Sequence, residues 1–260
     1  MFMSEYLNEE FCDFSNDASA TSFGWDFQVN AGIYLFLYYI QDATDIKIES
    51  KLQDIEITLK DNSKVFAQAK SAQDYTAVKD QKEKFKDAII SLSRNNYKGN
   101  KLLYISNIPN TFKQYDNCFN NSVISYTECL KGMKDEIDKT ISAIDKSLTD
   151  KISKEKDNNK SKKLKQLKNK IDDFHKENLY ISTIYPYYGP ENTRYTIIGD
   201  QIISFLVNTI GLDRDDATSI KQKLLEHWQL TFGHDSTIKD NDLNQKIKKN
   251  MIGYQTHLSI

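Results

Sequence analysis

Residues 48–70, IESKLQDIEITLKDNSKVFAQAK, hold parts of three predicted β-strands that are joined by short connections. Apolar and polar side chains alternate in residues 45–52 and again in residues 53–61, which is typical of a strand with one buried face. The turn signal Asp-Asn-Ser at 61–63 precedes the third predicted strand, residues 65–71. Connections this short favour an antiparallel meander.

Polar side chains that could bind a cation or a phosphate interrupt these strands at Glu49, Asp54, Glu56, Gln68 and Lys70. Antiparallel pairing would bring the start of the second strand beside the end of the third, so the side chains can converge at one edge of the sheet. Carboxylate, amide and carbonyl oxygens are the ligands that Mg²⁺ prefers. We therefore interpret Asp54, the side-chain oxygen of Gln68 and the carbonyl of Ala69 as Mg²⁺ ligands, and Mn²⁺ can substitute for Mg²⁺. Lys70 would orient the attacking water or neutralise charge on a phosphate.

A simpler interpretation of the same residues is a solvated sheet face. On such a face Asp54, Glu56 and Lys70 would form no more than a cross-strand ion pair. The presence of Gln68 and Glu49 in order, after a helix, favours a site instead. Glu56 shares the predicted face of Asp54 and is a candidate for a supporting role.

The segments on either side of the three strands indicate an α/β protein. Residues 27–43 are apolar nearly all round and should form a buried helix that Ser22 or Asp26 could cap. Residues 79–96 read as an amphipathic helix, and the apolar run at 101–108 has the length of a strand. A helix between two strands is expected to cross over onto the sheet.

Residues 128–177 predict a helical hairpin, inserted before a late strand candidate at 178–188. Apolar residues recur at spacings of three and four in 137–152 and in 164–174, and a polar gap separates the two runs. The lysine-rich tip could bind DNA phosphates without regard to sequence. The alternatives are a solvated hairpin end or an oligomer contact. The lysines concerned are Lys160, Lys162, Lys163 and Lys165.

The composition excludes several classes of protein. The 260 residues carry a net charge of −2, three cysteines without a CxxC spacing and four scattered histidines, so neither a zinc signature nor a disulfide scaffold is expected. Residues 1–17 lack the order of a signal peptide, and the apolar run 31–40 is too short to span a bilayer. We therefore expect a cytoplasmic protein with no membrane partner. Charge is uneven, because residues 1–60 hold eleven acids against three lysines, whereas 151–170 hold nine lysines against two acids.

The ordered set Glu49, Asp54-Ile55-Glu56 and Gln68-Ala69-Lys70 resembles the PD-(D/E)XK nuclease superfamily, in the variant where Gln replaces the acid of the third motif. Mrr-type restriction endonucleases use that variant. The chain is more similar to the CD-NTase-associated antiphage endodeoxyribonucleases and their relatives in bacterial defence operons. Those proteins place a Gly, an aromatic residue and a Gln on the first helix, here Gly24, Trp25 and Gln28. Gln28 could support the metal site or could cap a strand backbone.

The resemblance implies a restriction-endonuclease-like mixed sheet core, which we expect residues 1–127 and 178–195 to form. The spacing of apolar residues predicts the helical hairpin insert 128–177 and, after Tyr195, a C-terminal helical domain 196–260. It implies a Mg²⁺-dependent endodeoxyribonuclease that hydrolyses double-stranded DNA with little sequence specificity, as an effector of antiphage defence. The implied catalytic residues are Asp54, Gln68, Lys70 and Glu49. A homo-oligomer, or a sensor or ATPase from the same operon, would be the protein partner.

Two alternatives to a nuclease stay open. The fold could serve as a catalytically inactive DNA-binding or assembly subunit that partners an ATPase or sensor, or as a scaffold whose hairpin drives oligomerisation. The chain also departs from the family at Gln53-Asp54, where relatives often have two adjacent acids. Many relatives carry a C-terminal sensor of a cyclic oligonucleotide, for which we expect little room here.

Overall fold

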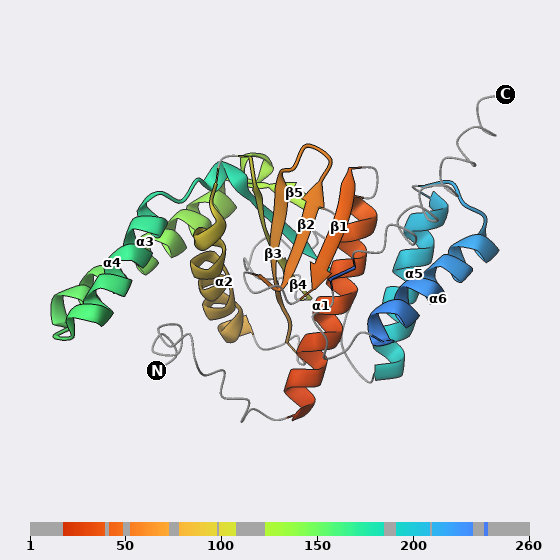
Figure 1. Cartoon of the computed structure of the whole chain (residues 1–260), viewed down its shortest axis with the longest axis horizontal. Coiled ribbons are helices and arrows are strands. Elements are labelled where there is room, and N and C mark those ends of the chain that lie inside the picture. Colours follow the sequence, from red (N-terminus) through yellow and green to blue (C-terminus); the bar gives the residue numbers. More distant parts are fainter. Residues whose placement is uncertain are drawn as a thin grey trace.

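The computed structural model describes residues 18–39, 42–48, 53–72, 78–97, 99–107, 123–184, 191–208, 210–230 and 237–238. The helices and strands are α1 (Ala18–Tyr38), β1 (Ala43–Ile48), β2 (Ile55–Leu59), β3 (Lys64–Lys70), α2 (Val78–Leu92), β4 (Lys101–Ser106), β5 (Val123–Ser125), α3 (Lys131–Lys154), α4 (Asn158–Asp172), β6 (Leu179–Thr183), α5 (Glu191–Asn208), α6 (Arg214–Leu230) and β7 (Thr237–Ile238). The described strands form one sheet in the order β5-β6-β4-β3-β2-β1-β7 (Figure 1). The sheet is mixed and helices cover it, so the predicted α/β class is confirmed.

The predicted meander is confirmed, because β1 pairs antiparallel with β2 and β2 pairs antiparallel with β3. The turn after β2 places Asn62 at a φ of 64°, a conformation that Asn tolerates better than most residues. The chain then crosses over through α2, and β4 lies parallel to β3. The predicted late strand is present as β6, parallel to β4, and β5 pairs antiparallel with it.

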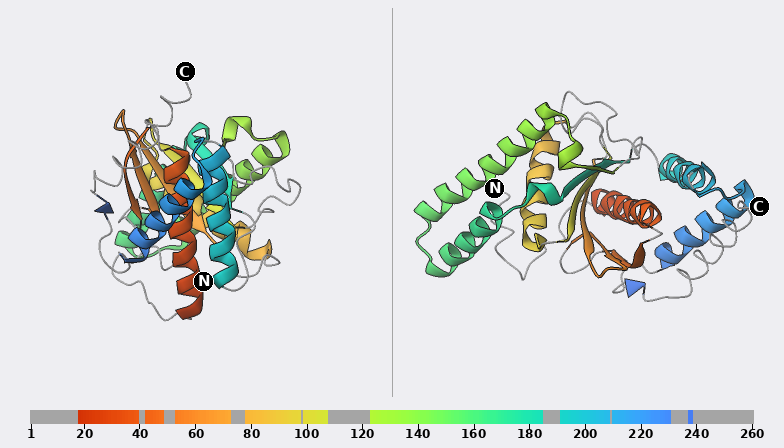
Figure 2. Two further views of the ribbon diagram at one scale, coloured as in Figure 1. Left: turned by 90° about the vertical axis from the view of Figure 1, so that its right-hand side faces the viewer. Right: turned by 90° about the horizontal axis from the view of Figure 1, so that it is seen from above.

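Two hydrophobic layers lie on opposite faces of the sheet. One face packs against α1, α5 and α6, and includes Ile55, Ile57 and Ala67. The other packs against α2 and the hairpin α3–α4, and includes Phe66 and Tyr104. The view from above separates the hairpin on one side from α5 and α6 on the other (Figure 2). Side chains alternate between the faces along each strand, so the α2 face of β2 also carries the even-numbered residues that the sequence singled out.

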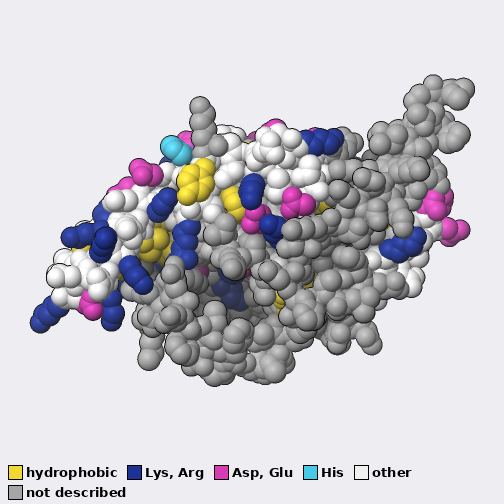
Figure 3. All heavy atoms as spheres, viewed as in Figure 1, with side chains coloured by type: hydrophobic (Ala, Val, Ile, Leu, Met, Phe, Trp, Pro, Cys, Tyr) yellow, Lys and Arg dark blue, Asp and Glu magenta, His cyan; other side chains and the backbone are white. Residues whose placement is uncertain are grey.

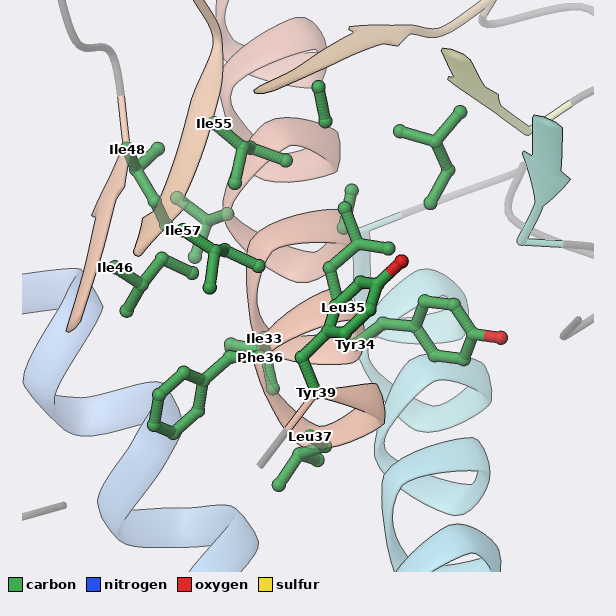
Figure 4. Close-up of a cluster of buried hydrophobic side chains, with 14 of the residues drawn as sticks. Ile33, Tyr34, Leu35, Phe36, Leu37, Tyr39, Ile46, Ile48, Ile55 and Ile57 are labelled. Carbon is green, nitrogen blue, oxygen red and sulfur yellow. The ribbon is translucent and has the colours of Figure 1, made fainter. Parts of the chain in front are cut away.

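Helix α1 is buried nearly all round, as its apolar composition predicts. Figure 4 shows Ile33, Leu35 and neighbouring side chains of α1 beside the isoleucines of β1 and β2. A Cβ at Gly32 would lie 2.8 Å from the Ile48 Cδ1, so the missing side chain allows α1 to lie this close to β1.

The predicted limits of this helix are wrong. The helix begins at Ala18, so Ser22 and Asp26 lie inside it and neither is its cap. It ends at Tyr38, and the N–H groups of Asp42 and Ala43 both donate to the Tyr39 carbonyl, which turns the chain into β1.

The helical hairpin is present, with buried apolar residues on the facing sides of its helices: Met133, Ile137, Ile144 and Leu148 on α3, and Leu164 and Ile171 on α4. The break between the helices is shorter than predicted. Asp157 accepts hydrogen bonds from the N–H groups of Asn159 and Lys160, and this cap starts α4 within the stretch expected to be irregular. Lys168 of α4 bonds Asp145 of α3 and ties the two helices together.

The C-terminal segment forms the helices α5 and α6 as predicted, but α5 begins at Glu191, before the expected start at residue 196. The prediction of an all-helical segment is wrong at β7, because this strand pairs with β1 and so extends the sheet. Ile202, Leu206 and Ala217 of α5 and α6 are buried in the same hydrophobic layer as α1. Residues 231–236 and 239–260 of the predicted C-terminal helical domain lie outside the described residues, and the division into domains stays a prediction. Within the described residues, none of the helices combines the length and apolar character needed to cross a membrane.

Candidate active site

Asp54 and Lys70 meet at the edge of the sheet where β2 begins and β3 ends. Ile55 pairs with Ala67, so the antiparallel register carries Asp54 to the level of Gln68. The Asp54 Oδ2 accepts hydrogen bonds from the Ala69 N–H at 2.9 Å and from the Lys70 Nζ at 3.1 Å, and Oδ1 accepts from the Gln68 Nε2 at 3.2 Å. The structure therefore brings together three residues that lie 14 to 16 positions from Asp54 in the sequence.

The Asp54–Lys70 ion pair is partly shielded yet reachable from solvent. The Asp54 side chain is 18% exposed and that of Lys70 is 24% exposed. Charges in such a position are attracted more strongly than in bulk water, because less solvent screens them. An ammonium with this exposure can still reach a phosphate oxygen or a water molecule outside the protein.

Helix α2 carries a carboxylate, Asp87, whose charge interacts with that of Lys70, and the sequence analysis missed it. Burial, and then the neighbouring Glu83 carboxylate, raise the pKa of Asp87, whereas the positive charge of Lys70 acts in the opposite direction. One helical turn earlier, the Lys84 Nζ donates a hydrogen bond to the Ser71 carbonyl at the end of β3. The sequence does hold a signal for these contacts. Positions 84, 87 and 91 are polar and share one face of the predicted amphipathic helix, so their side chains could be expected to lie together.

The backbone of Ala69 faces Asp54. In an extended strand the N–H and C=O of one residue project to the same side, and the Ala69 N–H is bonded to Asp54. The Ala69 carbonyl therefore lies on the side that a cation held by Asp54 would occupy. Both oxygens are of the kind that a hard divalent cation prefers, so these two residues fit Mg²⁺.

Gln68 presents its amide nitrogen, and not its oxygen, to Asp54. Gln68 is 5% exposed, so the position of its side chain is set by neighbouring protein groups. In this orientation Gln68 acts as a donor to the carboxylate. Its predicted role as an oxygen ligand would need the amide to be turned over.

Glu56 belongs to a separate ion pair. It shares the α2 face of β2 with Asp54, but its carboxylate is bonded to the Lys64 ammonium on β3. Glu56 is buried, so this partner balances its charge. The cross-strand ion pair of the simpler interpretation is present between Asp54 and Lys70. Glu56 pairs with Lys64 instead, and its supporting role in the site stays a prediction.

The structure does not bring Gln28 of the first-helix motif to the Asp54 edge. Gln28 lies on α1, which covers the face of the sheet opposite to Asp54. Its Oε1 atom is buried, and among the described residues it has no hydrogen-bond partner. Glu49 lies outside the described residues. Within the described part of the chain, no three Asp, Glu, His or Cys side chains gather to hold a metal ion, so Asp54 is the carboxylate on which a metal site there would depend.

The predicted DNA-contacting lysines are exposed on the first turns of α4. The space-filling view shows lysine and arginine side chains gathered over the hairpin (Figure 3). The hairpin extends away from the sheet, so these lysines and the Asp54 edge are separate features of the molecule (Figure 1). The lysines are Lys160, Lys162, Lys163 and Lys165.

Comparison with known proteins adds little to this description. No protein-family model matches the chain, and no curated protein matches it. Among solved structures, a Moraxella osloensis Cap4 SAVED/CARF-domain containing receptor is similar at 12% identity with a TM-score of 0.40. The similarity covers 89% of this chain and 48% of that chain, so the protein spans about half the length of the solved receptor. Values this low leave the function to be argued from the chain's own residues.

Proposed function

We propose that the protein is a metal-dependent DNA endonuclease that acts with little sequence specificity as an effector of bacterial antiphage defence. The observation that carries the proposal is the meeting of Asp54, the Ala69 backbone and Lys70 at one edge of the sheet. Further support comes from the mixed sheet, because the resemblance to nucleases implies a mixed sheet core and β3 pairs antiparallel with β2 but parallel with β4. The defence setting rests on that resemblance alone.

Each residue of the edge has a distinct task in hydrolysis of a phosphodiester. Asp54 and the Ala69 carbonyl would hold Mg²⁺, which when bound supplies a Lewis acid and a more acidic water molecule. Lys70 carries three N–H donors, and one of them is used by Asp54. The remaining donors can orient a water molecule or stabilise the negative charge that develops on the phosphate. Asp54 thereby also keeps the ammonium at the reacting position.

The hairpin would supply affinity for the DNA backbone. Exposed lysines bind phosphates by releasing condensed counterions, which gives affinity without sequence preference. This task suits α4, because Lys160, Lys162, Lys163 and Lys165 lie on its exposed turns. Lys168 has a different role, since it bonds Asp145 and Asp172 within the hairpin. Double-stranded DNA would be the substrate, and a sensor or ATPase from the same operon, or another copy of the chain, would control the activity.

Conversion of supercoiled plasmid by the full chain tests the proposal. Mg²⁺ or Mn²⁺ should support nicking or linearisation, and EDTA should stop it. Asp54→Asn should be inactive under all conditions, because it removes the carboxylate of the site. Cleavage that continues undiminished in EDTA would remove the metal from the mechanism.

A plasmid that stays intact with either metal, although the wild-type chain retards DNA in a gel, would favour the inactive DNA-binding subunit. One observation already gives that alternative some weight. Within the described ranges, Asp54 does not belong to any group of three Asp, Glu, His or Cys side chains that could hold a metal ion. An active nuclease would therefore draw on neutral oxygens or on Glu49.

A further inference from the structure

The orientation of the Gln68 amide is set by a chain of hydrogen bonds that begins on α2. Ser91 lies in the last turn of α2, where backbone carbonyls have no partner within the helix. Its carbonyl accepts a hydrogen bond from the Gln53 Nε2 at 2.9 Å. A carbonyl can only accept, so the nitrogen of the Gln53 amide must point to α2.

The Gln53 oxygen then faces the site. It accepts from the Gln68 Nε2 at 2.7 Å and from the Ser91 hydroxyl at 3.3 Å. Because this oxygen is an acceptor, Gln68 must also present its nitrogen. The second proton of the same nitrogen is donated to the Asp54 Oδ1 at 3.2 Å.

Burial makes this arrangement difficult to reverse. Gln53 is 3% exposed and Gln68 is 5% exposed, so water cannot easily replace a missing partner. Turning the Gln68 amide over would place its oxygen against the Gln53 oxygen. Turning both amides would place the Gln53 oxygen against the Ser91 carbonyl. Each alternative sets two acceptors against each other.

We propose that Gln53 is a positioning residue, which with the backbone carbonyl of Ser91 holds the Gln68 amide so that Gln68 serves Asp54 as a hydrogen-bond donor and not the metal as an oxygen ligand. The Gln68 donor fixes one carboxylate oxygen of Asp54, while Ala69 and Lys70 fix the other. Gln53 stands where related nucleases often have an acid, and an ionised acid could not donate to the Ser91 carbonyl. The effect of Gln53 on catalysis rests on the proposed nuclease function, whereas the orientation of the Gln68 amide does not.

Hydrogen exchange of the Gln68 side-chain amide, followed by NMR on the full chain, tests the orientation. Both protons should exchange slowly in the wild type and should remain slow when Mg²⁺ is added. In Gln53→Met the exchange should be at least about 10-fold faster, while the backbone amides of β2 and β3 keep their protection. Ser91→Ala is the matched control, because it keeps the backbone carbonyl and should leave the exchange near the wild-type rate.

The activity readout separates this proposal from the proposed function. Gln53→Met should lower kcat for plasmid cleavage at unchanged KM, since it disturbs Asp54 and not the binding of DNA. If Mg²⁺ releases both Gln68 protons in the wild type, the amide has turned its oxygen to the metal and the proposal is overturned; this titration needs no variant to fold. Slow Gln68 exchange in Gln53→Met would equally overturn it. A wild-type chain that never cuts DNA would refute the nuclease and leave the exchange result standing.

Discussion

The Lys70 ammonium lies 3.1 Å from the Asp54 Oδ2, across the edge where β2 begins and β3 ends. Both side chains keep part of their surface in water, and ion pairs near the surface typically contribute only about 0–1 kcal/mol to the free energy of unfolding. A gain in stability therefore explains little of why Lys70 is held beside Asp54. A role in the reaction explains the pair better, because Lys70 would be the reacting group and the Asp54 carboxylate can bind a cation.

Asp54 should dominate metal binding at this edge. Asp54→Asn keeps the size and shape of the side chain but removes the charged oxygen ligand, so we expect the affinity for Mg²⁺ and Mn²⁺ to fall at least ~10-fold, or ~1.4 kcal/mol. Isothermal titration calorimetry measures the change. Asp61→Asn is a suitable control, because Asp61 is an exposed turn carboxylate and its replacement removes the same charge. Equal metal affinity in Asp54→Asn and the wild type would refute this assignment.

Asp87 should make stability depend on pH. Its pKa is raised above the ordinary value of 3.8, chiefly by burial, so the folded protein binds the Asp87 proton more readily than the unfolded chain does. This contribution to stability is present at low pH and is lost as the pH rises through the raised pKa. Asp87→Asn should therefore have a higher Tm than the wild type at neutral pH and no such advantage well below pH 3.8.

Glu83→Gln checks the cause of that shift. Glu83 raises the pKa of Asp87 by charge repulsion, so removing its charge should give a smaller gain in Tm with the same dependence on pH. Thermal unfolding, followed by circular dichroism at neutral pH and well below pH 3.8, provides the measurement. A constant difference between Asp87→Asn and the wild type at all pH values would show that Asp87 does not titrate as described.

The packing between the hairpin helices should be sensitive to Leu148. The side chain is fully buried in the layer that joins α2, α3 and α4. Leu148→Ala should lower the free energy of unfolding by about 2–5 kcal/mol, because apolar burial is reduced and a cavity is left behind. Thr149→Ala at the exposed neighbouring position should change it by no more than ~0.5 kcal/mol. Urea unfolding curves of both variants compare the two costs, and equal costs would contradict the packing described.

The α4 lysines should set the salt dependence of DNA binding. Replacing Lys160, Lys162, Lys163 and Lys165 with Glu should weaken binding and flatten the plot of log affinity against log salt, by a slope of about 0.9 for each phosphate that is no longer neutralised. Fluorescence anisotropy with labelled duplex DNA gives the slope. The control is Lys139→Glu with Lys146→Glu, on exposed positions of α3. If the α4 variant keeps the wild-type slope, the hairpin does not bind phosphate.

The strands that carry the site were predictable because their signals are local. Alternation along 55–59 assigns Ile57 to one face and Glu56 to the other, and the Asp61 turn fixes the antiparallel neighbour. The short strands β5 and β7 gave no such signal, because β5 has three residues and β7 has two. Strands of that length exist through the partners they pair with, which lie far away in the sequence.

The surroundings of the site depend on tertiary packing, which no local pattern encodes. The sequence predicts that α2 covers the sheet. It does not predict that the Ser91 carbonyl accepts from Gln53, or that the charge of Asp87 interacts with that of Lys70. In the sequence Gln53 is only a departure from the family motif. The structure shows that its amide is hydrogen-bonded to both Ser91 and Gln68. The orientation of an amide follows from its neighbours, so the role of Gln68 could not be assigned from the residue type alone.

Plasmid cleavage by Lys70→Met, measured beside DNA binding, tests the central claim most directly. Methionine keeps most of the apolar stem and removes the ammonium, so the variant should fold and bind DNA like the wild type. Cleavage should fall at least ~100-fold, as expected when a group that stabilises transition-state charge is removed. Lys60→Met, at an exposed position just after β2, should cleave normally. If Lys70→Met cuts DNA as fast as the wild type, the edge formed by Asp54 and Lys70 is not the active site.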